Sequence, residues 1–397
     1  MLAEKTIVLG VTGSIAAYKM ANLASMLVKQ HADIHVIMTQ NATHFINPIT
    51  FETLTSNKCL VGTFDRNFQY NVEHVALAKR ADLFLVAPAS ANIIGKIANG
   101  IADDMLSTTI MACKAPKLIA PAMNTNMFEN PIVQDNLSKL ERFGYEIIHP
   151  AIGYLACGDT GAGKLPSEEF LFAHIMRHLH YEKDLLGKKV LVTAGPTVEA
   201  IDPVRFISNH STGKMGYAIA KCAMERGADV TLITGPTSLA APDFVTVIPI
   251  QSAKDMFEQV STYMEDADFI IKAAAVADYT PTQTATEKIK KSENDMSISL
   301  MRTNDILQYV GSHKRDNQVL CGFAMETQDL IANAQKKLQK KNADMIVANN
   351  LKVAGAGFGT DTNVVTIIKA DVIRELPLLS KDDVAKVILD EMIAFLA

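Results

Sequence analysis

The sequence predicts an α/β protein with two doubly wound domains in tandem, each built on a mainly parallel sheet. Along most of the 397 residues, short runs of aliphatic and β-branched residues alternate with longer segments of helical period. This alternation is typical of parallel sheets that are covered by helices on both faces. It also restarts after a polar stretch near the middle, YEKDLLGKK, and the length suits two or three domains of ordinary size.

In the first half, each apolar run that predicts a buried strand precedes a helical segment. Strands are expected in TIVLGVTG, DIHVIMT, LFLVAPAS and KLIAPAM. Helices are expected in SIAAYKMANLASMLVKQ, ANIIGKIANGIADDMLSTTIMAC and NPIVQDNLSKLERFG, with a last one in SEEFLFAHIMRHLH. We therefore place the first domain at residues 1–184.

The second half repeats this arrangement from Lys189. Its strands are expected in KVLVTAGP, VTLITGP, DFIIKAAAVADY, VLCGFAMET and DMIVANN, and a closing helix begins at Lys381. One long interruption, TPTQTATEKIKKSENDMSISLMRT, does not fit the alternation of a core. We expect a second α/β domain over residues 185–397 that carries this interruption between two strands.

Charge and cysteine content argue against several classes of function. With 38 basic and 43 acidic residues, the net charge of −5 provides no polycationic surface for nucleic acid or for an anionic membrane. The start, MLAEKTIVLG, predicts neither a signal peptide nor a transmembrane span, so we expect a cytoplasmic protein. The five cysteines form no C-x-x-C pair, which argues against a zinc site or a disulfide framework.

Polar residues follow several of the predicted strands of the first half. Ligands of doubly wound sheets bind beyond the carboxyl ends of the strands. Gly13 and Ser14 follow the first strand, where a close backbone approach and free helix amides favour a phosphate, although both are also ordinary turn residues. Ser90, Asn92 and Asn124 follow two other strands and are expected at the same edge.

The stretch LACGDTGAGKLP, residues 155–166, admits two interpretations. Its glycines and lysine have the spacing of a phosphate-binding P-loop, but Leu165 stands where a P-loop needs Ser or Thr for magnesium. The alternative is a glycine-rich flap that carries a functional thiol, Cys157. His74, in EHVALAKRAD, is a natural proton acceptor for a thiol, although a lone histidine is more often structural.

Several motifs together carry a resemblance to known families. GSIAAYK, EHVALAKRADLFLVAPASAN, PAMNTNMF and ACGDTGAGKLP resemble the flavin-dependent cysteine decarboxylases. TAGPTVEAIDPVRFISNHSTGKMG, AAVADY, EKIKK and GFAMET resemble phosphopantothenate–cysteine ligase. In this order they cover nearly the whole chain and resemble the bacterial family of bifunctional coenzyme A biosynthesis enzymes. The resemblance implies two Rossmann- or flavodoxin-like domains, a decarboxylase over 1–184 and a ligase over 185–397.

The resemblance implies two reactions on one chain. The ligase would activate 4'-phosphopantothenate with CTP and Mg²⁺ as an acyl-cytidylate, which the amine of cysteine then captures. The decarboxylase would use FMN to convert 4'-phosphopantothenoylcysteine to 4'-phosphopantetheine. A flavin suits this chemistry because an unactivated carboxylate loses carbon dioxide only if an electron sink exists, and oxidation of the thiol to a thioaldehyde creates one.

In the decarboxylase half, the resemblance implies that His74 is the base, Asn124 fixes the substrate carboxylate and Cys157 donates a proton. This favours the flap interpretation of residues 155–166, in which Gly158, Gly161 and Gly163 would allow the backbone angles of a moving flap. Phe128 stands where many relatives have Trp or Tyr. The FMN contacts implied are Gly13, Ser14, Thr39, Ser90 and Thr108.

In the ligase half, the resemblance implies that Asn209 engages the acyl-cytidylate and that Arg205 lies near the phosphopantothenate. Lys288 matches the essential lysine of a strap over the active site, and Asp305 matches a metal-linked position. Relatives often have Asn-Pro-Asp-Ile where this chain has TNDI at 303–306. The CTP contacts implied are Lys272, Ala273, Ala274, Asp278, Lys288, Asn304, Asp305, Ile306, Leu307, Phe323, Lys337 and Lys341.

Two other classes of function stay open. Some relatives of the decarboxylase half are regulatory flavoproteins that bind and inhibit a phosphatase. An NAD(P)-dependent dehydrogenase would also have nucleotide-type folds, although neither half shows a clean G-x-G-x-x-G. For the favoured class we expect only small-molecule substrates, and the resemblance implies a homo-oligomer with trimers through the first half and dimers through the second, which could build a dodecamer.

Overall fold

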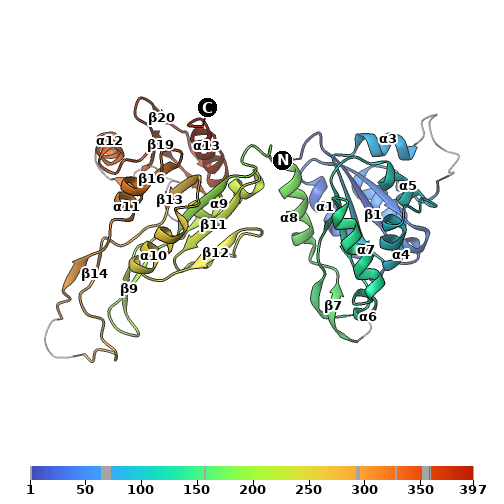
Figure 1. The fold of residues 1–397 in the computed structure, drawn as a ribbon, viewed down its shortest axis with the longest axis horizontal. Coiled ribbons are helices and arrows are strands. Elements are labelled where there is room, and N and C mark those ends of the chain that lie inside the picture. Colours follow the sequence, from blue (N-terminus) through green and yellow to red (C-terminus); the bar gives the residue numbers. More distant parts are fainter. Residues whose placement is uncertain are drawn as a thin grey trace. The chain divides into compact units, whose positions relative to one another are not determined.

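The structure is a computed structural model of the chain. It describes residues 2–63, 73–155, 158–291, 296–326, 329–350, 357 and 359–396. The chain forms two compact units, Met1–Tyr181 and Glu182–Ala397, and each is described by itself (Figure 1). Within the described ranges, no helix is both long enough and apolar enough to cross a membrane.

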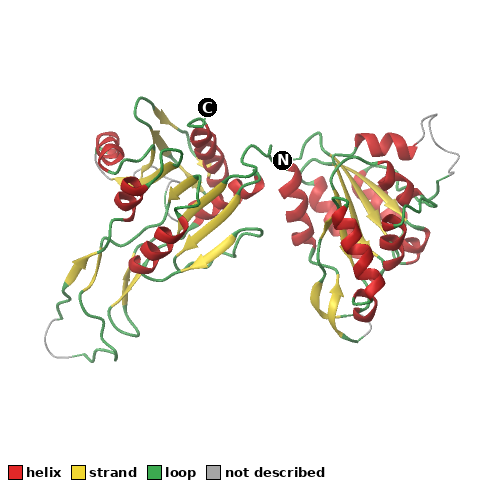
Figure 2. Cartoon of the chain, viewed as in Figure 1, coloured by secondary structure: helices red, strands yellow, loops and turns green. Residues whose placement is uncertain are grey.

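The first unit is built on a parallel sheet of five strands in the order β2-β1-β3-β4-β5. All residues of β1 and β3 are buried because helices cover both faces of the sheet, which explains their continuous apolar sequence (Figure 2). The strands are β1 (Thr6–Val11), β2 (Asp33–Met38), β3 (Leu83–Ala89), β4 (Lys117–Pro121) and β5 (Glu146–Ile147).

The helices of the first unit form two layers. Side chains of β1 alternate between them: Leu9 packs in one apolar cluster and Val8 in the other. One face is covered by α1 (Lys19–Val28), α2 (Pro48–Thr55) and α8 (Glu168–Leu179). The other is covered by α3 (Glu73–Arg80), α4 (Ala91–Ala98), α5 (Met105–Ala112) and α7 (Pro131–Arg142). Shorter helices are η1 (Ile15–Tyr18), η2 (Gln40–His44) and α6 (Thr125–Phe128).

The glycine-rich stretch forms an antiparallel hairpin of β6 (Ala151–Tyr154) and β7 (Thr160–Lys164). A P-loop would lead from a strand through the glycines directly into a helix. Here Gly161 and Gly163 belong to β7, and the next helix, α8, begins only after the capping residue Ser167. The P-loop interpretation is therefore wrong for this stretch.

The second unit is built on an eight-stranded sheet in the order β12-β11-β8-β13-β16-β17-β19-β20. The strands from β12 to β17 are parallel, and β19 and β20 are antiparallel additions at one edge. The strands are β8 (Lys189–Ala194), β11 (Asp229–Thr234), β12 (Thr246–Pro249), β13 (Phe269–Lys272), β16 (Val319–Glu326), β17 (Met345–Asn350), β19 (Val365–Ile368) and β20 (Ile373–Glu375). Both units thus confirm the predicted fold class.

Helices again cover both faces of this sheet (Figure 2). One face packs against α10 (Ala253–Tyr263), α11 (Ile306–His313) and α12 (Leu330–Lys340). The other packs against α9 (Lys214–Glu225), which in turn contacts α13 (Lys381–Ile393). A side chain at Gly216 would come within 2.5 Å of the Ala194 Cβ, so the glycine is what lets α9 approach β8 so closely.

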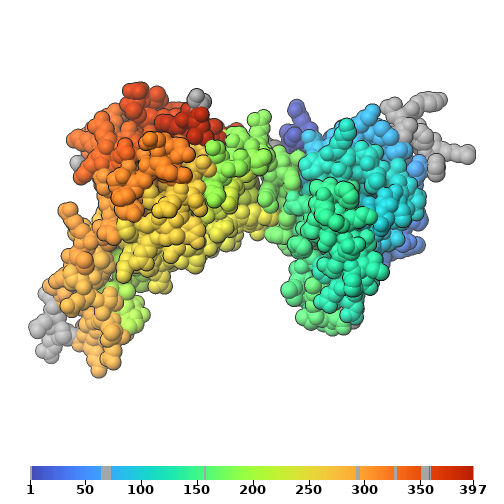
Figure 3. Space-filling view, in the orientation of Figure 1, coloured from blue at the N-terminus to red at the C-terminus, as the bar shows by residue number. Residues whose placement is uncertain are grey.

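The long interruption lies outside the main sheet, as expected. Its ends form β14 (Tyr279–Pro281) and β15 (Leu300–Arg302), which pair with each other in antiparallel fashion. Beside it lies a second small hairpin, β9 (Val198–Ala200) with β10 (Phe206–Ser208). Both extend away from the body of the second unit (Figures 1 and 3). A third pair, β18 (Thr362–Asn363) with β21 (Leu379–Ser380), precedes α13.

One ionic cluster fastens the edge of the first sheet to its last helix. The carboxylate of Glu146 on β5 contacts His174 Nδ1 and His178 Nε2 of α8, both at 2.6 Å. Burial alone would raise the pKa of the Glu146 carboxyl, but the hydrogen bonds from His174 and His178 outweigh burial and hold this pKa well below its usual range. The cluster therefore stabilises the unit most when Glu146 is ionised.

We expect Glu146→Gln to destabilise the first unit by about 2 kcal/mol at pH 7, because hydrogen bonds to a charged group contribute about that much. A carboxyl whose pKa is lowered on folding stabilises the fold above its unfolded pKa, and this contribution is lost as the pH falls through the lowered value. The difference in the free energy of unfolding between the parent protein and Glu146→Gln should therefore shrink below about pH 4.3. Urea unfolding of the full chain at several pH values measures it, with the exposed Glu141→Gln as control. A difference that does not change with pH would contradict this assignment.

Candidate active sites

A cavity of about 370 Å³ lies at the edge of the first sheet where β1 and β4 end. The loop after β1 contributes Ser14 and the loop after β4 contributes Asn124, while the β6–β7 hairpin contributes Tyr154 and Lys164. This is the carboxyl edge, where doubly wound sheets bind their ligands. The structure therefore brings two of the predicted polar residues, Ser14 and Asn124, to the same cavity.

Four of the predicted FMN residues, Gly13, Ser14, Thr39 and Ser90, lie in loops that directly follow strands. Ser14 caps η1 after β1, Thr39 precedes η2 after β2, and Ser90 caps α4 after β3. The Thr12 hydroxyl ties two of these loops together, because it donates to the Pro88 carbonyl at 2.7 Å and accepts from the Ser90 N–H at 3.0 Å. The strand-end pattern is thus confirmed as a spatial arrangement, although the capping roles alone would explain Ser14 and Ser90.

Two details of this edge fit a bound polar ligand. The Thr39 Oγ1 atom is buried and has no hydrogen-bond partner among the described residues, and leaving such a group unpaired costs about 1–3 kcal/mol. At Gly13, a Cβ would lie 2.8 Å from the Cβ of Asn41, so the glycine lets the loops after β1 and β2 approach each other. Thr108 does not directly follow a strand; it lies within α5 and donates to the Ala102 carbonyl at 3.3 Å.

The amide of Asn124 is held in one orientation. Its Oδ1 accepts the N–H of Asn126 at 2.9 Å as the cap of α6. Its Nδ2 donates to the carboxylate of Asp159, in the hairpin, at 3.1 Å. The two contacts fix which end of the amide faces the hairpin, and a carboxylate is what it binds there.

Two glycines let the hairpin lie directly on the loop that carries Asn124. A Cβ at Gly163, where φ is +126°, would come within 2.3 Å of the Met123 carbonyl oxygen. A Cβ at Gly161 would come within 2.6 Å of the Thr125 Oγ1. Gly158 also has a positive φ, whereas Gly161 does not in this conformation. Its role is to permit close packing.

The other two predicted decarboxylase residues are not placed in this cavity. His74 is the second residue of α3, is half-buried, and is not part of the cavity lining. Cys157 lies outside the residues that the structure describes. Phe128 ends α6 and packs against the cluster of β1, β3, α4 and α7, which agrees with an apolar contact at that position.

In the second unit, a cavity of about 490 Å³ gathers the predicted nucleotide contacts. All of them except Ala273 and Lys288 line it, and Asn304 and Asp305 do so without the proline that relatives often have. The cavity also contains Val276, Ala277, Tyr279, Arg302 and Thr303. Residues that are up to 69 positions apart in the sequence, from Lys272 to Lys341, thus meet at the carboxyl edge of β13 and β16.

A second cavity of about 580 Å³ adjoins the first. The two share Asp278, Phe323 and Lys337 in their lining. The second contains Asn209, whose Nδ2 donates to the Ala275 carbonyl at 3.0 Å, and the residues that begin α9. Ala273 also lines it. A ligand in the first cavity would therefore be in reach of one in the second.

Lys272 is the most unusual residue of the nucleotide cavity. It ends β13, its exposed fraction is only 7 %, and its Nζ has no hydrogen-bond partner among the described residues. Burial lowers the pKa of its ammonium to about 7, while the nearby carboxylate of Asp305 acts in the opposite direction. A buried amine without a partner is costly, which indicates a binding partner that the protein itself does not provide.

Three other charged side chains of this cavity, those of Asp305, Lys337 and Lys341, have partners within the protein. Asp305 caps α11 by accepting the Gln308 N–H at 2.9 Å, and it also forms an ion pair with Lys341. Burial would raise the pKa of the Asp305 carboxyl, but the hydrogen bonds from Lys341 and from Gln308 lower it overall. Lys337 donates to the Phe323 carbonyl at 2.8 Å. The lining as a whole carries more cations than carboxylates: Lys272, Arg302, Lys337 and Lys341 against Asp278 and Asp305. An anionic ligand is favoured.

Two predicted ligase residues lie outside both cavities. Arg205 follows β9 and forms an ion pair with Asp202. Lys288 is exposed and belongs to the segment between β14 and β15. The structure therefore does not bring either of them to the predicted nucleotide residues.

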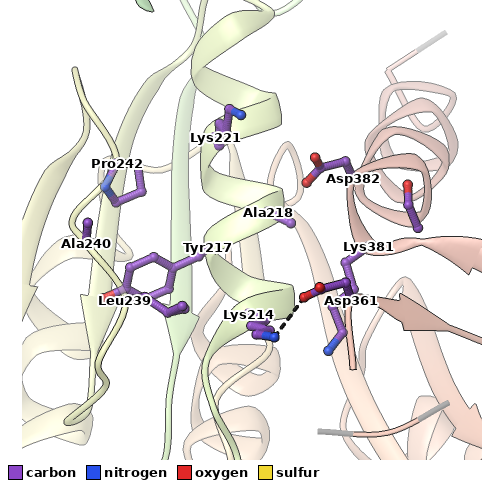
Figure 4. A pocket seen from close by; sticks show the side chains of 11 residues that line it. Lys214, Tyr217, Ala218, Lys221, Leu239, Ala240, Pro242, Asp361, Lys381 and Asp382 are labelled. Carbon is purple, nitrogen blue, oxygen red and sulfur yellow. Dashed lines mark hydrogen bonds and ion pairs between the residues drawn. The ribbon is translucent and has the colours of Figure 1, made fainter. Parts of the chain in front are cut away.

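Sequence reasoning missed two lysines of the second cavity, Lys214 and Lys381. Lys214, at the start of α9, contacts Asp361 at 2.7 Å and donates to the Gly359 carbonyl at 2.9 Å. Lys381 donates to the carbonyls of Gly357 and Thr360. The two lysines also line a neighbouring cavity of about 450 Å³ along α9, where the contact of Lys214 with Asp361 is visible (Figure 4). Lys214 lies within the motif that ends in STGKMG, but the motif assigned no role to it, and Lys381 lies in none of the motifs.

The magnesium expectation rests on Asp305 alone. Within the described ranges, no group of three or more His, Cys, Asp or Glu side chains is arranged to hold a metal ion. Mg²⁺ is commonly bound by one or two carboxylates together with substrate phosphates, so a single carboxylate beside an anion-binding cavity is compatible with it.

Comparisons with known proteins agree with both halves of the analysis. A family described as Flavoprotein matches residues 1–180, and one described as DNA/pantothenate metabolism flavoprotein C-terminal domain matches residues 185–396. The chain is 49% identical to the coenzyme A biosynthesis bifunctional protein CoaBC of Bacillus subtilis (strain 168), over 99% of this chain and 98% of that protein. It is 44% identical to CoaBC of Borreliella burgdorferi, over 97% and 98% of the two chains.

A solved crystal structure of the C-terminal domain of CoaBC is also similar. It shares 45% sequence identity and a TM-score of 0.47, and it covers 54% of this chain and 98% of that domain. The sequence relatives confirm the resemblance on which the residue assignments rest. The chain belongs to the CoaBC family of bifunctional coenzyme A biosynthesis enzymes.

Proposed function

We propose that this chain makes 4'-phosphopantetheine in two steps. The second unit would join cysteine to 4'-phosphopantothenate through an acyl-cytidylate, with CTP and Mg²⁺, and the first would decarboxylate the product with FMN. The observation that carries the proposal is the convergence of the predicted nucleotide contacts around one cation-rich cavity that adjoins the cavity of Asn209. Residues 1–184 and 185–397 are the proposed decarboxylase and ligase domains.

In the ligase, the cations of the first cavity would hold the triphosphate. Lys272 would gain the hydrogen-bond partner that it lacks, and the free amides at the start of α11 favour a phosphate. Asp305 would meet a phosphate-bound Mg²⁺. The acyl group would extend toward Asn209 in the adjoining cavity. The cysteine amine then loses a proton and forms the new C–N bond, while the bond from the acyl carbon to the CMP oxygen breaks.

In the decarboxylase, Ser14, Thr39 and Ser90 would hold FMN, and the buried Thr39 hydroxyl would gain a partner. When bound, FMN would supply the thiol oxidation that provides an electron sink for decarboxylation. Asn124 would orient the substrate carboxylate with the same Nδ2 that binds the Asp159 carboxylate. Cys157 remains our proposed proton donor.

His74, which is not part of the cavity lining formed by the described residues of one chain, would act as the base in a complete site to which a second copy contributes. This agrees with the proposal of trimers through the decarboxylase and dimers through the ligase, which could build a dodecamer. We further propose that the protein acts in the cytoplasm, on small-molecule substrates only.

The complete proposal is tested by incubating the purified protein with 4'-phosphopantothenate, cysteine, CTP and Mg²⁺ and analysing the products by mass. We expect phosphopantothenoylcysteine and then phosphopantetheine, together with visible flavin absorbance of the protein. A colourless protein that forms neither product would overturn both assignments.

Lys272→Met should raise the KM for CTP by roughly 10- to 100-fold, because a charge-assisted hydrogen bond of about 1.5–3 kcal/mol is lost. Decarboxylation of supplied phosphopantothenoylcysteine should stay unchanged, since it occurs in the other unit. Lys336→Met is the matched control, an exposed lysine of α12 that lines neither cavity. An unchanged KM for CTP in Lys272→Met would show that Lys272 does not contact the nucleotide.

Gly163→Ala should slow decarboxylation by roughly 100-fold, since displacement of the hairpin by about 1 Å is enough for such a loss. The new Cβ would collide with the Met123 carbonyl next to Asn124. Gly144→Ala controls for backbone strain alone, because Gly144 has a φ of +84° but a Cβ there would meet no atom of the described residues within 4 Å. Equal decarboxylation rates for the two variants would argue against a catalytic role of the hairpin.

A further inference from the structure

A loop and a distant segment of the second unit meet at one buried carboxylate. Asp202, in the loop between β9 and β10, has a fully buried side chain. It accepts the N–H groups of Val204 and Arg205 at 2.8 Å and that of Ile289 at 3.2 Å. Arg205 also binds this carboxylate through its guanidinium, and its Nη2 donates to the Ile289 carbonyl at 2.9 Å. Both polar backbone groups of Ile289 are therefore held.

Two weaker contacts fasten the same segment closer to β14. The N–H of Ala285 donates to the Ile201 carbonyl at 3.0 Å, and the Thr284 hydroxyl donates to the Ala200 carbonyl at 3.1 Å. The segment from Thr284 to Ile289 thus lies along the β9–β10 hairpin, and Asp202 and Arg205 hold it at Ile289. Lys288 lies directly before that grip and is exposed.

We propose that Asp202 and Arg205 form a clamp that positions Lys288 for the ligation step. Because the N–H and the carbonyl of Ile289 are both hydrogen-bonded, the clamp fixes the backbone next to Lys288. It thereby sets the position from which the Lys288 side chain extends. This inference rests on the proposed ligase function and changes the role of Arg205 from a substrate contact to a positioning residue.

The chemistry of the clamp agrees with a fixed position. A buried carboxylate is costly unless several donors satisfy it, and Asp202 has donors from both segments. Hydrogen bonds from the Arg205 guanidinium, and then from backbone N–H groups, hold the pKa of the Asp202 carboxyl well below its usual range. The clamp therefore stays charged throughout the neutral range. Arginine suits this role because its planar fork binds the Asp202 carboxylate through two nitrogens while Nη2 also donates to the Ile289 carbonyl, a fixed geometry that a lysine ammonium does not impose.

Steady-state ligation by Asp202→Asn, Arg205→Lys and the double variant tests the proposal. We expect each to lower the kcat of ligation roughly 10- to 100-fold, with the KM values for CTP and 4'-phosphopantothenate unchanged, because misplacement of a catalytic group affects the reacting complex more than binding. In a Lys288→Gln background, the same substitutions should cause no further loss, since they act through Lys288. Thr284→Val, which removes only an outer contact, should stay within about twofold of the parent.

A second readout does not depend on activity. Trypsin cuts after lysine, and cleavage between Lys288 and Ile289 needs the backbone that the clamp holds. In native protein we expect Asp202→Asn and Arg205→Lys to speed this cleavage by about 10-fold or more, as local opening becomes easier. Decarboxylation of supplied phosphopantothenoylcysteine shows that each variant is folded.

The outcomes separate the possible failures. A raised KM for 4'-phosphopantothenate in Arg205→Lys, with a normal Asp202→Asn enzyme, would make Arg205 a substrate contact and overturn the clamp. Unchanged kcat and unchanged cleavage in both variants would overturn it as well. Full ligation by Lys288→Gln would instead contradict the proposed role of Lys288 in the ligase.

Discussion

Both units depend on one constraint: a parallel sheet must bury both of its faces. Helices supply the cover, and as a result β1, β3 and β13 are buried at every position. Polar groups can then gather only where the strands end. Because parallel strands run in the same direction, their carboxyl ends meet at one edge. The loops that carry Ser14 and Asn124, and the end of β13 at Lys272, follow from this geometry.

At these edges some polar side chains form hydrogen bonds or ion pairs within the protein, and others have no partner among the described residues. Asn124 binds the Asp159 carboxylate, and Asp305 binds Lys341, so both groups have a protein partner that a ligand would replace or share. Thr39 Oγ1 and Lys272 Nζ are buried with no partner among the residues that the structure describes. Such atoms make the folded chain less stable than it could be, which agrees with sites shaped for ligands more than for stability.

The sequence predicted the features that short-range pattern and family motifs carry. The alternation of apolar runs and helical segments predicted both sheets, and the motifs predicted the lining of the nucleotide cavity. Contacts between segments that are distant in the sequence could not be predicted in this way, because no local pattern or motif marks them. The grip of Asp202 on Ile289 joins positions 87 residues apart through backbone groups, which any sequence possesses. Gly161 was expected for its backbone freedom, and the sequence did not show that its lack of a side chain also lets the hairpin lie against Thr125. The absence of His74 from the cavity that Asn124 lines likewise could not be predicted from the local sequence.

The central claim is that the two sheet edges are ligand sites whose open polar atoms are completed by FMN and by the nucleotide. A crystal structure of the full chain with FMN, CTP and Mg²⁺ bound tests it most directly. We expect a ligand acceptor within about 3.2 Å of Thr39 Oγ1 in the first unit and of Lys272 Nζ in the second. Ligands bound elsewhere, with both atoms still without a partner, would contradict it.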